Sequence, residues 1–510
     1  NKYLPSFTPK LISPIMLYNE SQNKAIKLGL TTIDIGIIQG PAGTGKTSVI
    51  VELINQLYQM GNRVLCTAFT NMAVDNVAEK LSEARISFLR LGNQYSINPE
   101  VRQFGILSHP DDFSNFIDGQ LEYPVLSTTS TIARKDYDHI KFDYAILDEA
   151  AQMTEPESLK ALIKSEIVIL VGDHAQLQPI VRSEKAKELS LHISLFEKLT
   201  KSIPNRFVRL IEQYRMNDEI LHFPNITFYN GELKSANNTI GSHQYHNFKG
   251  ELLNSKPYQV INISQDVNTG WNQLNLNEAR ITVKILHEII SSEQVEIHDI
   301  GVITPFRAQV AMLRNLLPGL DIDTIDRFQG SERKIIIFST VTTREVPILT
   351  DPRRLNVALT RAKMKLIILL SNPAVDGNSS LLQLMYEDAK ARDLVSHVTP
   401  DMIPTDDIFT LTEQISEYFD ISLRRDEALL ELFEKQYSIK ISQLSGIYYN
   451  SIMLIIEKVR EDLCQICKQN IESGVQCPGC LYWYHSDHLS SWVITHLNCP
   501  ICKHSLQLIQ

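Results

Sequence analysis

The sequence has little cysteine before residue 464, no long apolar run and no surplus of positive charge, and each shortage excludes a class of protein. Only Cys66 of the seven cysteines lies in the first 463 of the 510 residues, which excludes a chain-wide disulfide scaffold. The longest apolar runs, residues 167–171 and 366–370, are far shorter than the ~20 residues that cross a bilayer, which excludes a membrane protein. Acidic residues outnumber basic ones by 59 to 49, so nucleic acid would have to bind in a local basic channel.

The remaining composition is that of a globular protein. Hydrophobic residues make up 43% of the chain and charged residues 21%, which fills several cores and excludes a disordered tail. At ~150 residues per domain, about three or four domains are expected. The start lacks the basic and apolar regions of a secretion signal. Because the chain begins at Asn1 rather than Met, we expect that upstream sequence is missing.

Short β-branched runs alternate with helical patterns in two successive series. Strands are predicted at residues 33–38, 63–67, 142–147 and 167–171, and helices at 22–29, 47–59 and 73–84. A second series of strands is predicted at 259–263, 300–303, 335–340 and 365–370. Fully apolar strands alternating with helices predict parallel sheets covered on both faces, and therefore two α/β domains. A polar linker and helical patterns follow after residue 375.

Residues 40–47 read GPAGTGKT, between a predicted strand and a predicted helix. In this context the pattern predicts a loop whose backbone N–H groups and helix N-terminus bind phosphates. Lys46 would reach the β- and γ-phosphates, and the Thr47 hydroxyl would hold Mg²⁺. A chance glycine turn is the alternative. The glycine and threonine positions of the loop, predicted to contact ATP, are Gly40, Gly43, Thr44, Gly45 and Thr47.

Two acidic residues, Asp148 and Glu149, follow the apolar run 144–147. The carboxyl ends of parallel strands face the ligand crevice of such sheets. Asp148 would complete the Mg²⁺ ligands, and Glu149 would take the proton from the attacking water. The alternative is a solvated turn.

From Asn19 to Lys363 the sequence resembles the superfamily 1B helicases, similar to the nonsense-mediated-decay RNA helicase and senataxin. Besides the two motifs above, the matching segments are 19–22 (NESQ), 70–75 (TNMAVD), 127–129 (STT), 172–179 (GDHAQLQP), 213–216 (QYRM), 223–225 (FPN), 304–307 (TPFR), 326–332 (DRFQGSE) and 354–362 (RLNVALTRA), in the family's order. The resemblance implies two tandem RecA-like P-loop NTPase domains with ATP in the cleft between them and a single strand of RNA or DNA crossing above.

The resemblance also implies roles for single residues. Arg215 and Arg361 would reach the γ-phosphate, where positive charge accelerates phosphoryl transfer; surface cations at helix ends are the alternative. Gln176 would sense the γ-phosphate or the attacking water. Gln22 and Tyr214 would hold adenine, and Glu332 would contact the nucleotide. We expect Tyr229 to be a core aromatic. Contacts to the nucleic-acid backbone are predicted for Thr70, Asn71, Thr128, Thr304 and Thr324.

The last part of the chain predicts a zinc module. Four ligand pairs are present: Cys464 and Cys467, Cys477 and Cys480, His485 and His488, and Cys499 and Cys502. Eight such ligands fit two closed tetrahedral Zn²⁺ sites, with His496 and His504 as alternative histidines. The spacing resembles a variant RING or a PHD finger. In RING ubiquitin ligases, residues matching Ile466, Trp492 and Pro500 bind the ubiquitin-conjugating enzyme; a purely structural finger is the alternative.

The predicted organisation has four parts: residues 1–200 and 201–375 as the two RecA-like domains, 376–460 as a helical linker and 461–510 as the RING-like zinc domain. The predicted function is an ATP-dependent helicase or translocase on single-stranded nucleic acid that uses ATP, Mg²⁺ and two Zn²⁺. A ubiquitin ligase positioned by its ATPase motor and a nucleotide-gated clamp without unwinding are the alternatives. Reduced thiols and ATP indicate an intracellular protein, in the cytoplasm or nucleus.

Overall fold

The computed structural model describes residues 13–93, 96–102, 106–107, 123–243, 248, 250–263, 274–292, 295–341, 346–371, 380–404, 408–420, 475–476 and 483–484. The chain divides into two compact units. The first comprises Asn1–His243, Gln329–Glu332 and Asp351–Met364, and the second comprises Gln244–Phe328, Arg333–Thr350 and Lys365–Gln510. Two late segments therefore belong to the first unit.

The first unit is built on an eight-stranded sheet with the order β4-β3-β5-β2-β6-β7-β1-β8, in which every neighbouring pair is parallel. Its strands are β1 (Ile35–Gln39), β2 (Val64–Ala68), β3 (Leu89–Leu91), β4 (Ile106–Leu107), β5 (Val125–Thr128), β6 (Phe142–Asp148), β7 (Ser165–Gly172) and β8 (Phe207–Arg209). Parallel strands end at one common edge, so the loops after β1, β2, β5, β6 and β7 lie along the same side of the sheet.

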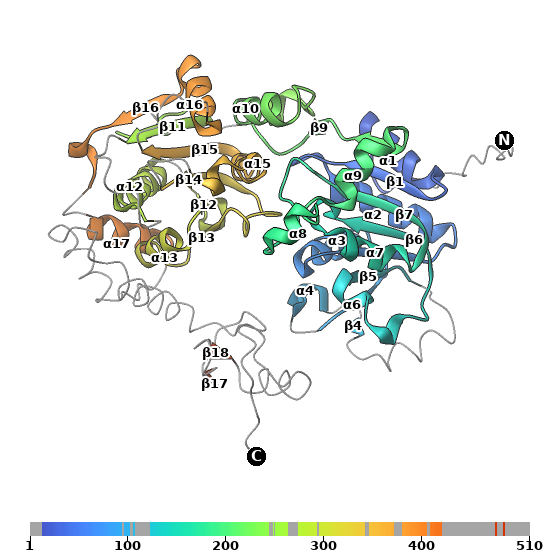
Figure 1. Ribbon diagram of the computed structural model, residues 1–510. Helices are drawn as coiled ribbons and strands as arrows, with labels where there is room; N and C mark the ends of the chain where they lie inside the picture. The colour runs from blue at the N-terminus through green and yellow to red at the C-terminus, as the bar shows by residue number, and fades with distance from the viewer. Residues whose placement is uncertain are drawn as a thin grey trace. The chain divides into compact units, whose positions relative to one another are not determined.

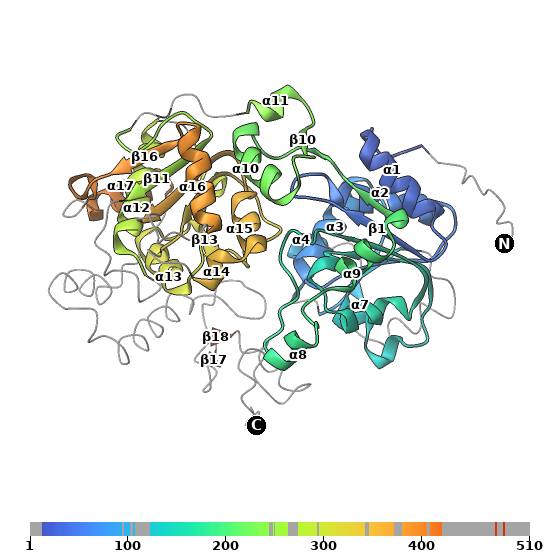
Figure 2. The same ribbon diagram turned by 45° about the horizontal axis from the view of Figure 1, so that its top comes forward.

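Consecutive side chains of each central strand enter opposite cores. In β1, Ile38 packs in one apolar cluster and Ile37 in the other, and in β2, Cys66 and Leu65 divide in the same way. Helices α1 (Glu20–Thr31), α2 (Lys46–Gln59) and α3 (Asn71–Glu83) cover the first face, and α6 (Thr129–Ile132), α7 (Glu155–Leu162) and α9 (Leu195–Ser202) cover the second (Figure 1, Figure 2). This explains why the strands are apolar throughout instead of alternating.

Shorter elements complete the first unit. They are α4 (Pro99–Arg102), η2 (Lys135–Tyr137), η3 (Ala150–Gln152), α8 (Glu184–Glu188), η4 (Pro204–Arg206), the parallel pair β9 (Glu212–Gln213) and β10 (Lys234–Ser235), α10 (Asp218–Phe228), α11 (Asn238–Gly241) and α15 (Pro352–Leu359). Among these, α15 comes from one of the two late segments.

The second unit contains a six-stranded sheet with the order β13-β12-β14-β15-β11-β16. Its strands are β11 (Tyr258–Ile263), β12 (Ile300–Thr304), β13 (Asp321–Thr324), β14 (Arg333–Ser339), β15 (Ala362–Ser371) and β16 (Val395–Val398). Helices α12 (Leu276–Ser292), α13 (Arg307–Leu316) and α17 (Ile408–Tyr418) share one apolar cluster with this sheet. The other elements are η6 (Ile297–Asp299), α14 (Pro347–Thr350), α16 (Leu381–Ala391), η7 (Pro400–Met402) and the antiparallel pair β17 (Val475–Gln476) and β18 (Trp483–Tyr484).

The predicted class, parallel α/β with two tandem sheets, is confirmed. All eight predicted strands and all three predicted helices are present, with ends shifted by a few residues. The edge strands β4, β8, β13 and β16 and the inner strands β3 and β5 were not predicted, because each has only two to four residues. The four predicted domain ranges stay predictions. The eight predicted zinc ligands, together with residues 421–460 of the predicted helical linker, lie outside the described residues.

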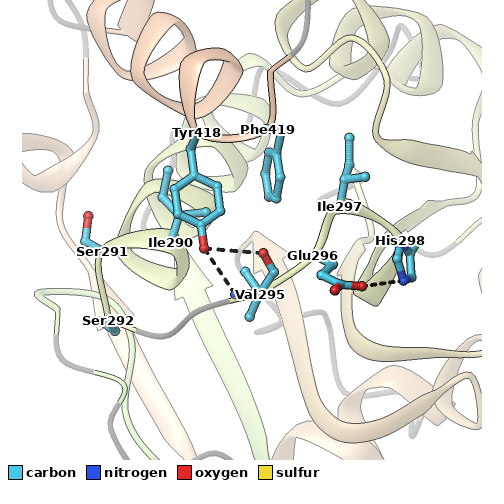
Figure 3. A pocket seen from close by; sticks show the side chains of 9 residues that line it. All are labelled: Ile290, Ser291, Ser292, Val295, Glu296, Ile297, His298, Tyr418 and Phe419. Carbon is cyan, nitrogen blue, oxygen red and sulfur yellow. Dashed lines mark hydrogen bonds and ion pairs between the residues drawn. The ribbon is translucent and has the colours of Figure 1, made fainter.

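A shallow pocket in the second unit lies where α17 meets the end of α12. Its lining includes Ile290 and the rings of Tyr418 and Phe419, which are labelled in Figure 3. The Tyr418 hydroxyl accepts a hydrogen bond from Val295 N at 3.2 Å and donates one to Val295 O at 3.3 Å. These bonds fasten the end of α17 to the loop after α12. The pocket is lined mainly by apolar side chains and contains none of the predicted site residues.

Glu278 is a buried carboxyl group that joins strand ends of the second unit. Its Oε2 atom accepts hydrogen bonds from Ser339 Oγ at 2.6 Å and Val341 N at 2.8 Å. Its Oε1 atom accepts one from Ser371 Oγ at 2.8 Å. Ser339 and Ser371 end β14 and β15, and Val341 has a φ of 71°, which is rare for a β-branched residue. Burial raises the pKa of Glu278 to about 7, against the opposing effect of its hydrogen bonds.

We expect Glu278→Gln to remove a pH dependence of stability. Because the folded-state pKa is about 7 and that of a free glutamate is 4.5, the folded chain keeps this proton to higher pH than the unfolded chain. The free energy of unfolding of the wild type should therefore fall as pH rises from about 4.5 to 7, by on the order of a few kcal/mol, and the variant should not follow it. Thermal unfolding of both proteins across this range measures the difference. If the free energies of unfolding of the wild type and the variant differ by the same amount at every pH, the prediction is contradicted.

Candidate functional site

The loop between β1 and α2 has the geometry of a phosphate cradle. Gly43 and Gly45 have φ angles of 74° and 83°, in the region that favours glycine. Gly45 is the N-cap of α2 and offers no side-chain hydrogen bond, so the first N–H groups of the helix are free to bind an anion. Lys46 Nζ donates to Gly40 O at 2.7 Å, so the ammonium group of Lys46 lies over the loop. A side chain at position 40 would lie 2.1 Å from Lys46 Cγ. These residues fit a bound triphosphate.

The segment after β9 runs against this loop. Tyr214 N donates to Gly43 O at 2.8 Å, and a Cβ atom at Gly43 would lie 2.6 Å from Arg215 Cβ. Gly43 is therefore required both by its φ angle and by the close approach of Arg215. The contact brings one of the two predicted γ-phosphate arginines to the phosphate loop.

Gln22 and Tyr214, the predicted adenine contacts, are brought together through Asn19. Asn19 caps α1, accepting from Gln22 N at 2.8 Å, and its Nδ2 atom donates to the Tyr214 hydroxyl at 2.9 Å. Gln22 Nε2 donates to Thr44 O at 3.1 Å, so this glutamine is tied to the loop itself. Gln22 is buried and Tyr214 is 44% exposed. The tyrosine ring is thus accessible beside the loop, as a stacking residue must be.

Asp148 and Glu149 lie at the end of β6, at the same sheet edge as the loop. Burial, and then the negative charge of Glu149, raise the pKa of Asp148, while the positive charge of Lys46 acts against them. A divalent cation would stabilise this buried carboxylate, and with the Thr47 hydroxyl in the first turn of α2 the donor set suits Mg²⁺. Glu149 has a φ of 50°, and its Oε2 atom accepts from Gln152 Nε2 at 3.0 Å. The strained backbone turns this carboxylate out of the strand direction.

Gln176 belongs to a buried network around Asp173, the residue after β7. Asp173 Oδ2 accepts from Gln176 Nε2 at 2.9 Å and from the Tyr229 hydroxyl at 2.8 Å, and Asp173 Oδ1 accepts from Gln39 Nε2 at 2.9 Å. Asn356 Nδ2 in α15 donates to the Tyr229 hydroxyl at 2.7 Å. Sequence reasoning missed the roles of Asp173 and Asn356, although both lie inside matched motifs. Tyr229 is buried, as expected of a core aromatic, but its hydroxyl is part of the network.

Arg361 is 2% exposed, which excludes the alternative of a surface cation. Its Nε atom donates to Val357 O at 2.8 Å and its Nη2 atom to Thr360 Oγ1 at 2.9 Å. Burial and then the charge of Arg215 lower its pKa to about 9, whereas Tyr229 and Glu149 raise it. The arginine therefore stays charged at neutral pH and lies within electrostatic range of Glu149.

Arg215 is held by Glu332. Arg215 Nε and Nη2 lie 2.6 Å and 2.5 Å from Glu332 Oε2, and Arg215 Nη1 donates to Thr360 O at 2.9 Å. Lys363 Nζ lies 2.7 Å from the other carboxylate oxygen. Burial opposes ionisation of Glu332, but these two cations outweigh it and lower the pKa to about 2. Glu332 is thus an ionised partner of two cations, Arg215 and Lys363.

The predicted nucleic-acid contacts lie at strand ends of both units. Thr70 and Thr128 cap α3 and α6, accepting from Ala73 N at 3.2 Å and Thr131 N at 3.3 Å. Asn71 Oδ1 accepts from Arg90 at 2.9 Å. In the second unit, Thr304 and Thr324 are register partners at the ends of β12 and β13. Thr304 is fully buried, and its hydroxyl has no partner within the described part of the chain.

Among the described residues there is no cluster of three or more potential metal ligands. Cys66 is buried, and burial raises the pKa of its thiol. In the same part of the chain, no helix is long and apolar enough to cross a membrane.

Two family models match the chain. Residues 17–111 and 124–184 match one model described as an AAA domain, and residues 191–372 match another with the same description. The chain is 32% identical over 409 residues to the Saccharomyces cerevisiae DNA replication ATP-dependent helicase/nuclease DNA2, covering 72% of this chain and 26% of that protein. The Homo sapiens DNA2 is 33% identical over 406 residues, covering 72% and 38%.

A third relative and a solved structure are also similar. The Schizosaccharomyces pombe DNA polymerase alpha-associated DNA helicase A is 31% identical over 440 residues, covering 71% of this chain and 66% of that protein. The crystal structure of Arterivirus nonstructural protein 10 (helicase) is 16% identical with a TM-score of 0.38, covering 68% of this chain and 61% of that one. The chain spans well under half of the DNA2 relatives, with 26% and 38% of their lengths matched.

We expect Glu149→Gln to abolish ATP turnover and to preserve ATP binding. Glutamine has the same shape and can still accept from Gln152, but it cannot take a proton, so the rate should fall by about 100-fold or more. Steady-state hydrolysis and equilibrium binding of labelled ATP measure the two properties. Glu166→Gln, an exposed carboxylate on β7, is the matched control and should behave as the wild type. Normal turnover of Glu149→Gln would remove Glu149 from the role of base.

Proposed function

Because its matched helicase domains make the chain a member of the superfamily 1 helicases, we propose that it hydrolyses ATP to translocate along single-stranded nucleic acid and to separate strands. The observation that carries the proposal is the assembly of one compact unit in which the phosphate loop, the acidic pair after β6 and two arginines come together. Phosphoryl transfer needs a cradle for the phosphates, a base and positive charge, and this unit contains all three.

Each side chain has a distinct task in this proposal. Lys46 and the free N–H groups of α2 bind the phosphate oxygens, while Thr47 and Asp148 hold the Mg²⁺ that neutralises their charge. Glu149 takes a proton from the attacking water. Arg215 and Arg361 stabilise the charge that develops at the γ-phosphate. Since Arg215 is already paired with Glu332, its move to the phosphate exchanges one anionic partner for another and leaves no buried charge unpaired.

The remaining details of the family resemblance are also proposals. Gln22 and the exposed ring of Tyr214 bind adenine, and Glu332 controls Arg215 or contacts the nucleotide. The subgroup, superfamily 1B, rests on the order of the sequence motifs. The relatives' names refer to DNA helicases, which favours DNA over RNA as the strand. Thr70, Asn71, Thr128 and Thr324 contact its phosphates, which holds a strand without reading its sequence. Thr304 is fully buried and is therefore left out of this set.

Homopolymers of matched length test the proposal. ATP hydrolysis by the full chain should rise severalfold with single-stranded DNA and less with RNA, and the stimulation should weaken with salt because phosphate contacts release counterions. A partial duplex with a labelled strand separates unwinding from translocation alone. Lys46→Ala is the matched negative control. ATP hydrolysis that no polynucleotide changes would contradict the motor, and hydrolysis-independent strand binding that ATP switches off would support a clamp instead.

For the C-terminal residues we propose two structural Zn²⁺ sites formed by the four ligand pairs between Cys464 and Cys502. Ile466, Trp492 and Pro500 favour a second function, binding of a ubiquitin-conjugating enzyme. Metal analysis of the purified chain should give about two zinc ions per molecule, because eight thiolate and imidazole ligands complete two tetrahedra. A zinc content near zero would contradict the module. With zinc present, ubiquitin chains that form equally with the wild type and Ile466→Ala would contradict the ligase.

A further inference from the structure

Tyr229 is a buried tyrosine whose hydroxyl has two partners of opposite character. The side chain is 1% exposed and follows α10. Its hydroxyl donates to Asp173 Oδ2 at 2.8 Å and accepts from Asn356 Nδ2 at 2.7 Å. A buried hydroxyl costs free energy unless it is hydrogen-bonded, and here both its donor and its acceptor capacity are used. Packing accounts for the aromatic ring, which phenylalanine would provide equally well. It does not account for the hydroxyl group.

Helix α15 makes other contacts with the loop after β7, but these end on the main chain. Arg353 Nε donates to His174 O at 3.0 Å, and Asn356 Nδ2 donates to Ala175 O at 2.8 Å. Neither contact reaches the side chain of Asp173 or Gln176. The path through Tyr229 does, because it ends on the same Asp173 oxygen that accepts from Gln176 Nε2.

The other end of this path leads to both arginines. Asn356 O accepts from Thr360 Oγ1 at 2.7 Å, and Thr360 Oγ1 in turn accepts from Arg361 Nη2 at 2.9 Å. Thr360 O accepts from Arg215 Nη1 at 2.9 Å. Side-chain hydrogen bonds therefore connect Gln176 through Asp173 and Tyr229 to the amide of Asn356. From there the main chain of residues 356–360 leads to the hydroxyl and carbonyl groups of Thr360 that accept from the two guanidinium groups.

We propose that the Tyr229 hydroxyl is a positioning group that couples the Gln176 loop to α15, so that Gln176 and the two arginines take up their positions at the γ-phosphate together. This inference rests on the proposed function of the site. Without the hydroxyl, Asp173 keeps three donors and Asn356 keeps Ala175 O, so both halves of the network persist but lose their side-chain connection. Because Tyr229 is only 1% exposed, it acts through Asp173 and Asn356.

Tyr229→Phe tests this by removing one oxygen atom. Turnover should fall about tenfold, the cost of losing one buried hydrogen bond to a charged group. The affinities for two nucleotides should respond differently. Affinity for the slowly hydrolysed analogue ATPγS should fall about fivefold. Affinity for ADP, which has no γ-phosphate, should stay within about twofold of the wild type. A purely structural role would lower both affinities together.

The chain offers a matched control in Tyr258. This tyrosine of β11 is equally buried, at 1% exposure, and its hydroxyl has no hydrogen-bond partner among the described residues. Tyr258→Phe removes the same atom from the other unit and should leave turnover and both affinities unchanged. Thermal unfolding of the two variants shows whether either loses folded protein.

A second variant, Asn356→Ala, cuts the same path on the far side of the hydroxyl. In the Asn356→Ala background, Tyr229→Phe should change the ratio of ATPγS affinity to ADP affinity by less than about a further twofold. The effects of two groups that act through one connection are not additive. Fully additive effects, or a Tyr229→Phe variant with the wild-type ratio, would overturn the inference. A wild-type chain without polynucleotide-stimulated hydrolysis would overturn the proposed function instead, and the affinity ratio would still decide the role of Tyr229.

Discussion

The candidate site depends on one buried carboxylate, that of Asp173. A carboxylate only 1% exposed is tolerated as an ion when donors surround it. Here the donors come from three separate parts of the chain: Gln39 at the end of β1, Gln176 and Ala175 N after β7, and Tyr229 after α10. Removing any of them leaves a buried charge under-satisfied, which is more costly than losing an apolar contact. The charge therefore specifies how these segments meet, whereas apolar packing alone would allow more than one arrangement.

Buried polar side chains have the same effect elsewhere in the two sheets. In the first unit, Arg90 is fully buried between Asp75 Oδ1 and Asn71 Oδ1, both at 2.9 Å, so it fixes the start of α3. In the second unit, Glu278 fixes the ends of β14 and β15. The networks around Asp173 and Glu278 both lie where strands end. That edge is where parallel α/β sheets bind ligands, because loops there can vary without disturbing the core.

The two arginines illustrate how positive charge is kept ready beside a phosphate loop. Burial and the charge of Arg215 lower the pKa of Arg361, yet a pKa of about 9 leaves Arg361 charged at neutral pH. Glu332 offsets part of the repulsion between the two arginines. Arg215 and Lys363 lower the pKa of Glu332 to about 2, so these cations strongly favour its ionised form. An incoming phosphate would meet guanidinium groups that are already desolvated and oriented, so little reorganisation is needed when charge develops.

The sequence alone was sufficient for the layers of the fold. Apolar runs of four to six residues alternating with helical patterns specify parallel sheets, because only strands buried on both faces lack polar alternation. It also located the phosphate loop, since GPAGTGKT requires particular backbone angles and a following helix, and both properties are local. Short strands such as β3 and β16 escaped prediction, because two to four residues carry too little pattern to distinguish a strand from a loop.

Tertiary structure decided which residues meet. No local pattern reveals that Arg215 lies against Gly43, that Glu332 pairs with Arg215, or that the hydroxyl of Tyr229 joins Asp173 to Asn356. These partners are separated by 56 to 172 residues. The contacts of Glu332 and Asn356 also depend on how the late segments 329–332 and 351–364 return to the first unit. Sequence determines the chemistry that each segment carries, because side chains and backbone preferences are local. The assembly of those groups into one site is a property of long-range packing, which only the folded chain possesses.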